Sequence, residues 1–290
     1  MEDFDVVVVD NASRDGSVEM VKKSYPWVKI IDSGANLGFA KANNIGFQAV
    51  DCKYVLFLNP DTELVDNSIY KMTNYLDMHP TYGAVGPRMT YGDGTVQPLG
   101  LQWYPSPWNE FLSIFFVTSS SVRYLKHILP YKDPLKSGEV KKLYGGCILG
   151  RKEMFDRINV FDERFFMYGE DVDLCVKIRN IGYKIYYMSE AFIIHHCGGS
   201  SKTAASQFST LMKCESICSF MGKYYGKMGE LCYKVIIFSG SFFRLMYFSF
   251  VRLIKFNKIE CNLNEIENSI RKYRSMVMWS LNYEKPVIMK

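Results

Sequence analysis

The sequence lacks the signatures of several common protein classes. Its eight cysteines form no C-x-x-C pair, and several lie within apolar runs, which predicts buried free thiols in a reducing cytoplasm. The first residues, MEDFD, are acidic where a signal peptide would be basic, so we expect no export. Neither a G-x-G-x-x-G pattern nor a Walker lysine loop is present, which argues against a Rossmann dehydrogenase and a P-loop kinase.

A basic surface is absent from most of the chain. Of its 290 residues, 35 are Lys or Arg and 30 are Asp or Glu, a net charge of +5. Residues 1–222 hold 23 basic and 25 acidic side chains, a balance of −2, whereas residues 223–290 hold 12 and 5, a balance of +7. Because phosphate binding needs a basic stripe on the folded domain, we expect no nucleic-acid partner.

What the sequence does contain is an alternation of short apolar segments and helical segments. The 48% of hydrophobic residues suffices for a packed core, and the length allows one large domain with an appendage. The pattern predicts strands at 4–9, 28–31 and 54–58, and helices at 18–24, 39–50 and 68–78. This spacing is typical of βαβ units and of an α/β fold with a mostly parallel, doubly wound sheet flanked by helices.

The second half of the chain predicts more of the same domain and then a separate tail. We expect a hairpin around residues 91–95, a loop-and-helix insertion at 105–140, strands at 143–149, 184–187 and 191–195, and helices at 152–158, 171–181 and 204–225. The α/β domain then covers residues 1–225, and residues 226–290 form a basic, aromatic, helical tail.

The tail contains an apolar stretch, residues 231–254, that three cations interrupt: Lys234, Arg244 and Arg252. A spanning helix needs about 20 mostly apolar residues, so these cations argue against a simple span. A helix lying in the membrane surface, with its cations among the headgroups, fits the pattern better. A core or dimer helix and a true span are the alternatives, and self-association stays open.

Two groups of polar residues follow predicted strands, where ligands bind in open α/β sheets. Asp61 lies in an Asn-Pro-Asp-Thr turn and either caps the turn or holds a Mg²⁺ or Mn²⁺ ion that carries a diphosphate. His195 and His196 end a later strand, before the pair Gly198–Gly199. Adjacent strand residues point to opposite faces, so at most one histidine faces the site, as a metal ligand or as a structural residue.

Three carboxylates begin the helix predicted at 171–181. Glu170, Asp171 and Asp173 suit the helix dipole, which alone explains acids at this position. Glu170 and Asp173 share a helix face, whereas Asp171 points elsewhere. An Asp that faces a pocket beside an incoming hydroxyl would serve as a general base. The loop from Asn36 to Asn44 also precedes a helix, and that position suits an anion or a nucleotide.

Five motifs, taken in order, resemble those of a family 2 glycosyltransferase, and more narrowly of its bacterial rhamnosyltransferase-like branch. They are Val9–Ser13, Asn36–Asn43, Asn59–Thr62, Phe161–Tyr168 and Asp171–Cys175, and the resemblance covers residues 4 to about 201. It implies the nucleotide-sugar transferase fold called GT-A. In the family another strand and helix precede the strand with which this chain begins, so we expect a sheet that lacks a central strand.

The resemblance also implies roles for individual residues. Asp171 matches the catalytic base, and Glu170 and Asp173 would support the acceptor or the helix. Asp61 matches the metal-binding acid, and His196 matches a histidine that reaches the metal or the diphosphate. The residues expected to bind the nucleotide or the donor sugar are Asp10, Asn11, Asn36, Gly38, Asn43, Asn59, Asp61, Gly145 and Gly146.

The function so implied is an inverting, metal-dependent transfer of a sugar, with rhamnose as one candidate. The donor would be a dTDP- or UDP-sugar, and the acceptor a hydroxyl of a cell-surface polysaccharide or a lipid-linked glycan, at the inner face of the cell membrane. A truncated, inactive nucleotide-sugar-binding partner protein is the alternative. A nucleotidyltransferase fits less well, because the glycine-rich basic loop that would cradle a triphosphate is missing.

Overall fold

The computed structural model describes residues 4–116, 129–196, 207–255 and 263–286. The chain forms two compact units, one from Met1–Gln102, Pro130–Gly199 and Met289–Lys290, the other from Trp103–Leu129 and Ser200–Ile288. The boundary expected after residue 225 instead falls inside a helix of the second unit, at a kink at Gly226.

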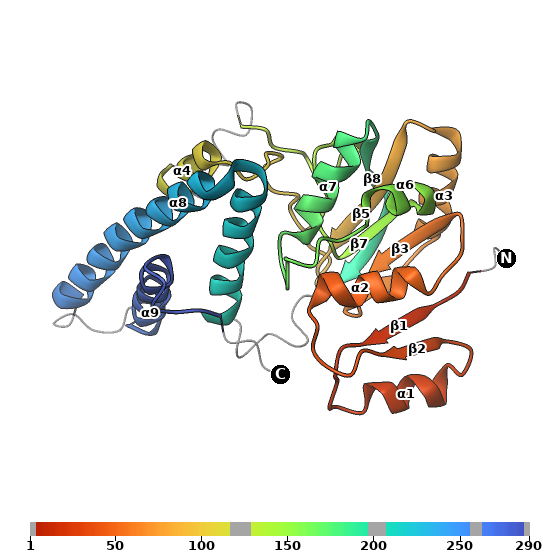
Figure 1. The fold of residues 1–290 in the computed structure, drawn as a ribbon, viewed down its shortest axis with the longest axis horizontal. Helices are drawn as coiled ribbons and strands as arrows, with labels where there is room; N and C mark the ends of the chain where they lie inside the picture. Colours follow the sequence, from red (N-terminus) through yellow and green to blue (C-terminus); the bar gives the residue numbers. More distant parts are fainter. Residues whose placement is uncertain (1–3, 117–128, 197–206, 256–262, 287–290) are drawn as a thin grey trace. The chain divides into compact units, whose positions relative to one another are not determined.

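The first unit begins with the alternation that the sequence predicts. It runs through β1 (Val7–Asp10), α1 (Ser17–Ser24), β2 (Lys29–Asp32) and α2 (Phe39–Gln48). β1 and β2 pair in parallel and form a two-stranded sheet of their own (Figure 1). Among the described residues, β1 pairs with β2 alone.

A six-stranded sheet forms the centre of the unit. Its strands are β3 (Tyr54–Leu58), β4 (Thr62–Leu64), β5 (Tyr82–Thr90), β6 (Gly138–Val140), β7 (Cys147–Arg151) and β8 (Lys184–His195). The order is β3-β7-β5-β8-β4, with β6 also on β8. β5 and β8 are parallel, and the other pairs in this sheet are antiparallel.

Two details of the prediction are therefore wrong. The sheet is mixed and not mostly parallel, because β7 inserts between β3 and β5 in the direction opposite to both. The two short strands expected at 184–187 and 191–195 are one strand, β8. The pairing of β8 with β5 shifts register between Pro87 and Arg88, and this irregularity separates the two halves.

Helices cover both faces of the sheet, as alternate residues of β3 show. Leu56 packs against the core that includes Met72 and Leu76 of α3 (Ser68–Met78). Phe57 points to the other face, where its ring lies 6.3 Å from that of Phe47 on α2 and 5.3 Å from that of Phe155 on α6 (Lys152–Ile158). α7 (Glu170–Asn180) follows and carries the acidic cluster. This is the α/β layering expected of GT-A.

The second unit is helical. It contains α4 (Pro107–Phe115), α8 (Gln207–Lys255) and α9 (Leu263–Ser280), drawn together in Figure 1. α4 confirms the helix expected in the insertion, and the Ser106 hydroxyl caps it by accepting the Asn109 N–H at 3.1 Å. α8 continues beyond the expected end at residue 225 after the kink, and its buried Met221 and Tyr233 pack with Trp279 of α9.

Candidate active site

Asp171 lies in the first turn of α7, with its carboxylate held by two backbone amides. The Gly145 N–H donates to Oδ2 at 3.0 Å, and the Val172 N–H donates to Oδ1 at 2.7 Å. Burial raises the pKa of Asp171, although the two amides and the charge of Lys142 oppose the rise. A carboxylate with a raised pKa accepts a proton at a pH where an ordinary Asp does so poorly, which suits a general base.

The two acids beside Asp171 are buried in the helix packing. Glu170 is 6% exposed, and burial together with the Asp171 charge raises its pKa to about 8. Asp173 is fully buried, and its carboxylate lies 3.8 Å from the Lys177 ammonium. The face that these two share is thus the packed face of α7, and Asp171 is the acid whose side chain meets the Gly145 segment.

The turn after β3 lies against the same glycine segment. The Asn59 N–H donates to the Gly146 carbonyl at 3.0 Å, and the Thr62 hydroxyl donates to the Asn59 carbonyl at 2.6 Å. These bonds hold Asp61 in the turn. Since Gly145 contacts Asp171 and Gly146 contacts Asn59, the structure brings the two predicted acidic motifs to one edge of the sheet.

His195, and not His196, is the histidine whose ring meets Asp61. Its Nε2 lies 3.3 Å from Asp61 Oδ1, and its Nδ1 lies 3.2 Å from Gln97 Oε1. The ring of His196 lies on the other side of the strand, with Nε2 3.2 Å from Glu63 Oε2. Only the ring of His195 lies at Asp61, and the role of His196 at the metal or the diphosphate stays a prediction. The glycine pair Gly198–Gly199 lies outside the described residues.

The residues around Asp61 are of the kind that could hold a divalent cation. Among the described residues no group of three or more His, Cys, Asp or Glu side chains converges. Asp61 and His195 nevertheless offer an oxygen and a nitrogen 3.3 Å apart, and buried Asn59 Oδ1 has no hydrogen-bond partner in the described part of the chain. Mg²⁺ and Mn²⁺ sites use one or two carboxylates and take their remaining ligands from substrate oxygens and water.

The predicted nucleotide residues form a second group, at the carboxyl ends of β1 and β2. Asn11 Oδ1 accepts the Leu37 N–H at 2.8 Å, and the Asn11 amide donates to Asn36 Oδ1 at 3.1 Å. The carboxylate of Asp10 accepts the Ser13 N–H at 3.2 Å. Asn43 does not join this group, because its amide donates to the Phe39 carbonyl one turn earlier in α2.

Phe166 connects the two groups. Its carbonyl accepts the Phe39 N–H at 2.7 Å, and Gly38 is so close that a Cβ atom there would lie 2.7 Å from the Phe166 ring. The loop before α2 therefore packs on the segment that leads into Asp171.

Two further residues at the site were not predicted. Asn44 bonds the Phe161 backbone in both directions, at 2.9 and 3.1 Å, and so anchors the aromatic segment to α2. Tyr144 precedes Gly145, and burial followed by the Asp171 charge raises its pKa. Asn44 lies within the loop from Asn36 to Asn44, so the sequence offered a signal for it. Tyr144 is a single Tyr before two glycines, and the sequence offered no signal for its place at the site.

Comparison with known proteins agrees with this geometry. Residues 1–158 match the family model described as glycosyl transferase family 2, and residues 132–197 match one described as the N-terminal domain of galactosyltransferase. The chain belongs to glycosyl transferase family 2. The resemblance noted in the sequence is thus confirmed.

Among similar proteins, two rhamnosyltransferases stand out. The N-acetylglucosaminyl-diphospho-decaprenol L-rhamnosyltransferase of Mycobacterium tuberculosis (strain ATCC 25618 / H37Rv) is 30% identical over 218 residues, 66% of this chain and 66% of that protein. The rhamnosyltransferase WbbL of Escherichia coli (strain K12) is 24% identical over 216 residues, 71% of this chain and 78% of that protein. The match therefore leaves about a third of the mycobacterial relative uncovered.

Solved structures show the fold. GalNAc-T7 with UDP, GalNAc and Mn²⁺ superimposes with a TM-score of 0.52 at 13% identity, over 97% of this chain and 52% of that one. TarS 1-349 of S. aureus in complex with UDP-GlcNAc gives a TM-score of 0.51 at 17% identity, over 97% and 74%. The expected GT-A fold is confirmed, with the mixed sheet described above.

Proposed function

We propose that the protein transfers a sugar, with inversion, from a dTDP- or UDP-sugar to a hydroxyl of a cell-surface polysaccharide or a lipid-linked glycan. The observation that carries the proposal is the Asp171 carboxylate, held by the Gly145 N–H next to the turn that contains Asp61. Membership in family 2 supports sugar transfer. The names of the two bacterial relatives make rhamnose the first sugar to test among the proposed donors.

Asp171 is proposed as the general base. As the acceptor oxygen attacks the anomeric carbon, its proton moves to the Asp171 carboxylate. The new C–O bond forms on the face opposite the departing diphosphate, so the configuration inverts. The sugar becomes oxocarbenium-like as the old bond breaks, and the leaving diphosphate carries the negative charge. Asp171 then releases the proton to water, which restores the carboxylate for the next turnover.

The donor would lie along the edge that joins the two groups of residues. Asp61 and His195, with Asn59, are the residues proposed to hold Mg²⁺ or Mn²⁺, which when bound neutralises charge on the diphosphate. Asn11 and the loop before α2 would position the nucleotide, because a helix N-terminus favours an anion. In this proposal Asp10 contacts the base, and Gly145 and Gly146 lie beside the sugar.

A catalytically weak nucleotide-sugar-binding partner is the second candidate. The observation that favours it is that, among the described residues, β1 pairs with β2 alone, so that Asp10 lies on a two-stranded sheet and Asn11 directly follows it. A two-stranded sheet positions these residues less firmly than a larger sheet does. Loose positioning of the donor lowers the rate of transfer more than it lowers the affinity for the donor.

Isothermal titration calorimetry tests the proposal first. With Mn²⁺ present, we expect heat of binding for dTDP, UDP or both, and a loss of that heat when EDTA replaces the metal. If neither dTDP nor UDP gives heat of binding, the proposed donor is contradicted. A second assay supplies dTDP-rhamnose or a UDP-sugar together with a polyprenyl-diphosphate sugar as acceptor. Nucleotide binding without release of nucleotide in this assay would favour the second candidate.

A further inference from the structure

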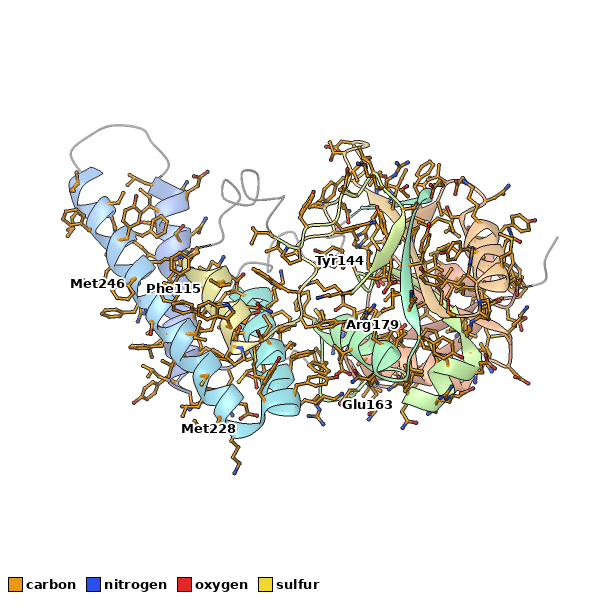
Figure 2. All side chains as sticks on the ribbon, turned by 90° about the horizontal axis from the view of Figure 1, so that it is seen from above. Phe115, Tyr144, Glu163, Arg179, Met228 and Met246 are labelled. Atoms are coloured by element: carbon orange, nitrogen blue, oxygen red, sulfur yellow. The ribbon has the colours of Figure 1, made fainter. Side chains whose placement is uncertain are left out.

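The second unit carries an apolar face that remains exposed among the residues the structure describes. α8 is long and apolar enough to cross a membrane. Only 17% of its apolar 18-residue window is buried, so most of that window is exposed. Its exposed side chains after the kink include Met228, Leu231, Val235, Phe243, Met246 and Phe250. Those of Met228 and Met246 project away from the helix in Figure 2. Exposed apolar residues are common singly, but a continuous row on one helix marks an interaction surface.

The row follows one side of the helix. Its members lie three, four or eight residues apart, spacings that keep them on one side of a helix, and the residues buried between them, such as Tyr233, Ile237 and Ser241, face the opposite side. At 1.5 Å per residue, the stretch from Met228 to Ile254 is about 40 Å long. Both sides of α8 are therefore largely apolar, and only one of them is packed against other helices.

The three cations that interrupt this stretch do not lie in the exposed row. The Lys234 ammonium donates to Asn282 Oδ1 at 2.7 Å, and Arg252 lies 3.6 Å from the Glu267 carboxylate of α9. The Arg244 guanidinium donates to the Ile114 carbonyl at the end of α4. Partners on the neighbouring helices thus draw the charges to the packed side, and the row itself contains no charge.

α4 extends the apolar face. A groove between α4 and α8 is lined by Trp108 and Phe111 on one side and by Leu231 and Val235 on the other. Trp108 is 64% exposed. Tryptophan is enriched where proteins meet the boundary between lipid headgroups and acyl chains, since its ring is apolar and its N–H is polar.

The charge around this face suits anionic lipid. α9 packs along α8 and exposes Arg271, Lys272 and Arg274, and the described residues of the second unit hold 11 basic against 6 acidic side chains, a balance of +5. Basic residues next to an apolar helix face are attracted to anionic headgroups. A non-obligate protein interface is on average only about as apolar as the rest of a protein surface, whereas the exposed row of α8 is apolar throughout.

We propose that the exposed row of α8, together with α4, docks in the plane of a phospholipid membrane, with the basic residues of α9 at the headgroups. Spanning is disfavoured because the opposite side of α8 is packed on α9, whose charged residues would have to enter the bilayer as well. The proposal deepens the proposed function, on which it rests only for the lipid-linked acceptor, because docking would bring the enzyme to such an acceptor.

Vesicle co-sedimentation of the full chain tests this proposal. We expect binding to vesicles of phosphatidylcholine with phosphatidylglycerol, weaker binding to phosphatidylcholine alone, and roughly ten-fold weaker partitioning for Phe243→Glu or Met246→Glu. The matched control is Tyr70→Glu, which places the same charge at a 57% exposed aromatic position in the first unit and should bind as the wild type does. Circular dichroism checks that each variant is folded.

Three results would overturn the proposal. One is unchanged vesicle binding by both row variants. Another is resistance to alkaline carbonate extraction, which would show that α8 spans the bilayer. The third is a vesicle-free dimer that Phe243→Glu converts to a monomer, because a second copy would then cover the row. None of these measurements depends on sugar transfer, so failure here is distinct from failure of the proposed reaction.

Discussion

Glu170 is buried directly beside Asp171, and one of its carboxylate oxygens, Oε2, has no hydrogen-bond partner among the described residues. Its raised pKa, about 8, means that the folded protein holds a proton that the unfolded chain releases above its ordinary value of 4.5. Below pH 4.5 Glu170 is protonated in both the folded and the unfolded protein, so it no longer makes the free energy of unfolding depend on pH. Stability is therefore lost as pH rises from about 4.5 to about 8.

Glu170→Gln should flatten this dependence, since the amide does not ionise. We expect the fall in the free energy of unfolding between pH 5 and pH 8 to shrink by on the order of 2 kcal/mol, measured by urea denaturation across that range. Glu19→Gln, at an exposed position in the first turn of α1, is the control and should leave the slope as it is. Identical slopes for wild type and Glu170→Gln would contradict the burial argument.

The two histidines at the end of β8 give a matched pair of variants. Because the His195 ring lies at Asp61 and the His196 ring lies at Glu63, His195→Ala should weaken Mn²⁺-dependent nucleotide binding, by roughly ten-fold or more. His196→Ala should change it little. Titration calorimetry of both variants with UDP and Mn²⁺ decides, and a larger loss for His196→Ala would restore the assignment that the motif alone favoured.

At the scale of elements, the loop before α2 depends on one glycine. Gly38 has φ +82° and ψ 173°, a conformation essentially confined to glycine, and a side chain there would also meet Phe166. Gly16 before α1 has φ +80° as well, but nothing lies within 4 Å of a Cβ placed there.

Gly38→Ala should therefore cost more stability than Gly16→Ala. The control carries left-handed strain alone, about 1 kcal/mol, whereas Gly38→Ala adds the displacement of Phe166 and should lose roughly 2–4 kcal/mol. Chemical denaturation measures both changes. Equal losses would show that Phe166 moves aside freely and that the loop is not tied to the segment leading into Asp171.

The sequence predicted the elements better than their pairing. α3 and α6 match the expected ranges 68–78 and 152–158, because apolar spacing and turn residues are local signals. The antiparallel insertion of β7 and the unbroken β8 could not be predicted, because they depend on which distant strands meet. The same limit applies to the site: the motifs predicted Asp61 and Asp171, but only the pairing of Thr62 with His195 shows which histidine ring meets Asp61.

At the scale of the whole molecule, the net charge of +5 divides between two different surfaces. The first 222 residues, nearly neutral, contain the acids of the candidate active site, and the excess of cations lies in residues 223–290. The excess thus belongs largely to the helices proposed to dock on lipid. The chain joins a GT-A unit to a helical unit whose apolar face is unpacked.

The central claim is that Asp171 is the base of a sugar transfer, and the most direct test compares Asp171→Asn with wild type. The assay follows transfer from dTDP-rhamnose and UDP-sugars to a polyprenyl-diphosphate acceptor, with nucleotide binding measured in parallel. Asp156→Asn, in an exposed ion pair with Lys152, is the control. We expect Asp171→Asn to lose at least about 100-fold in transfer rate and to keep its nucleotide affinity. Near-normal transfer by Asp171→Asn would contradict the central claim.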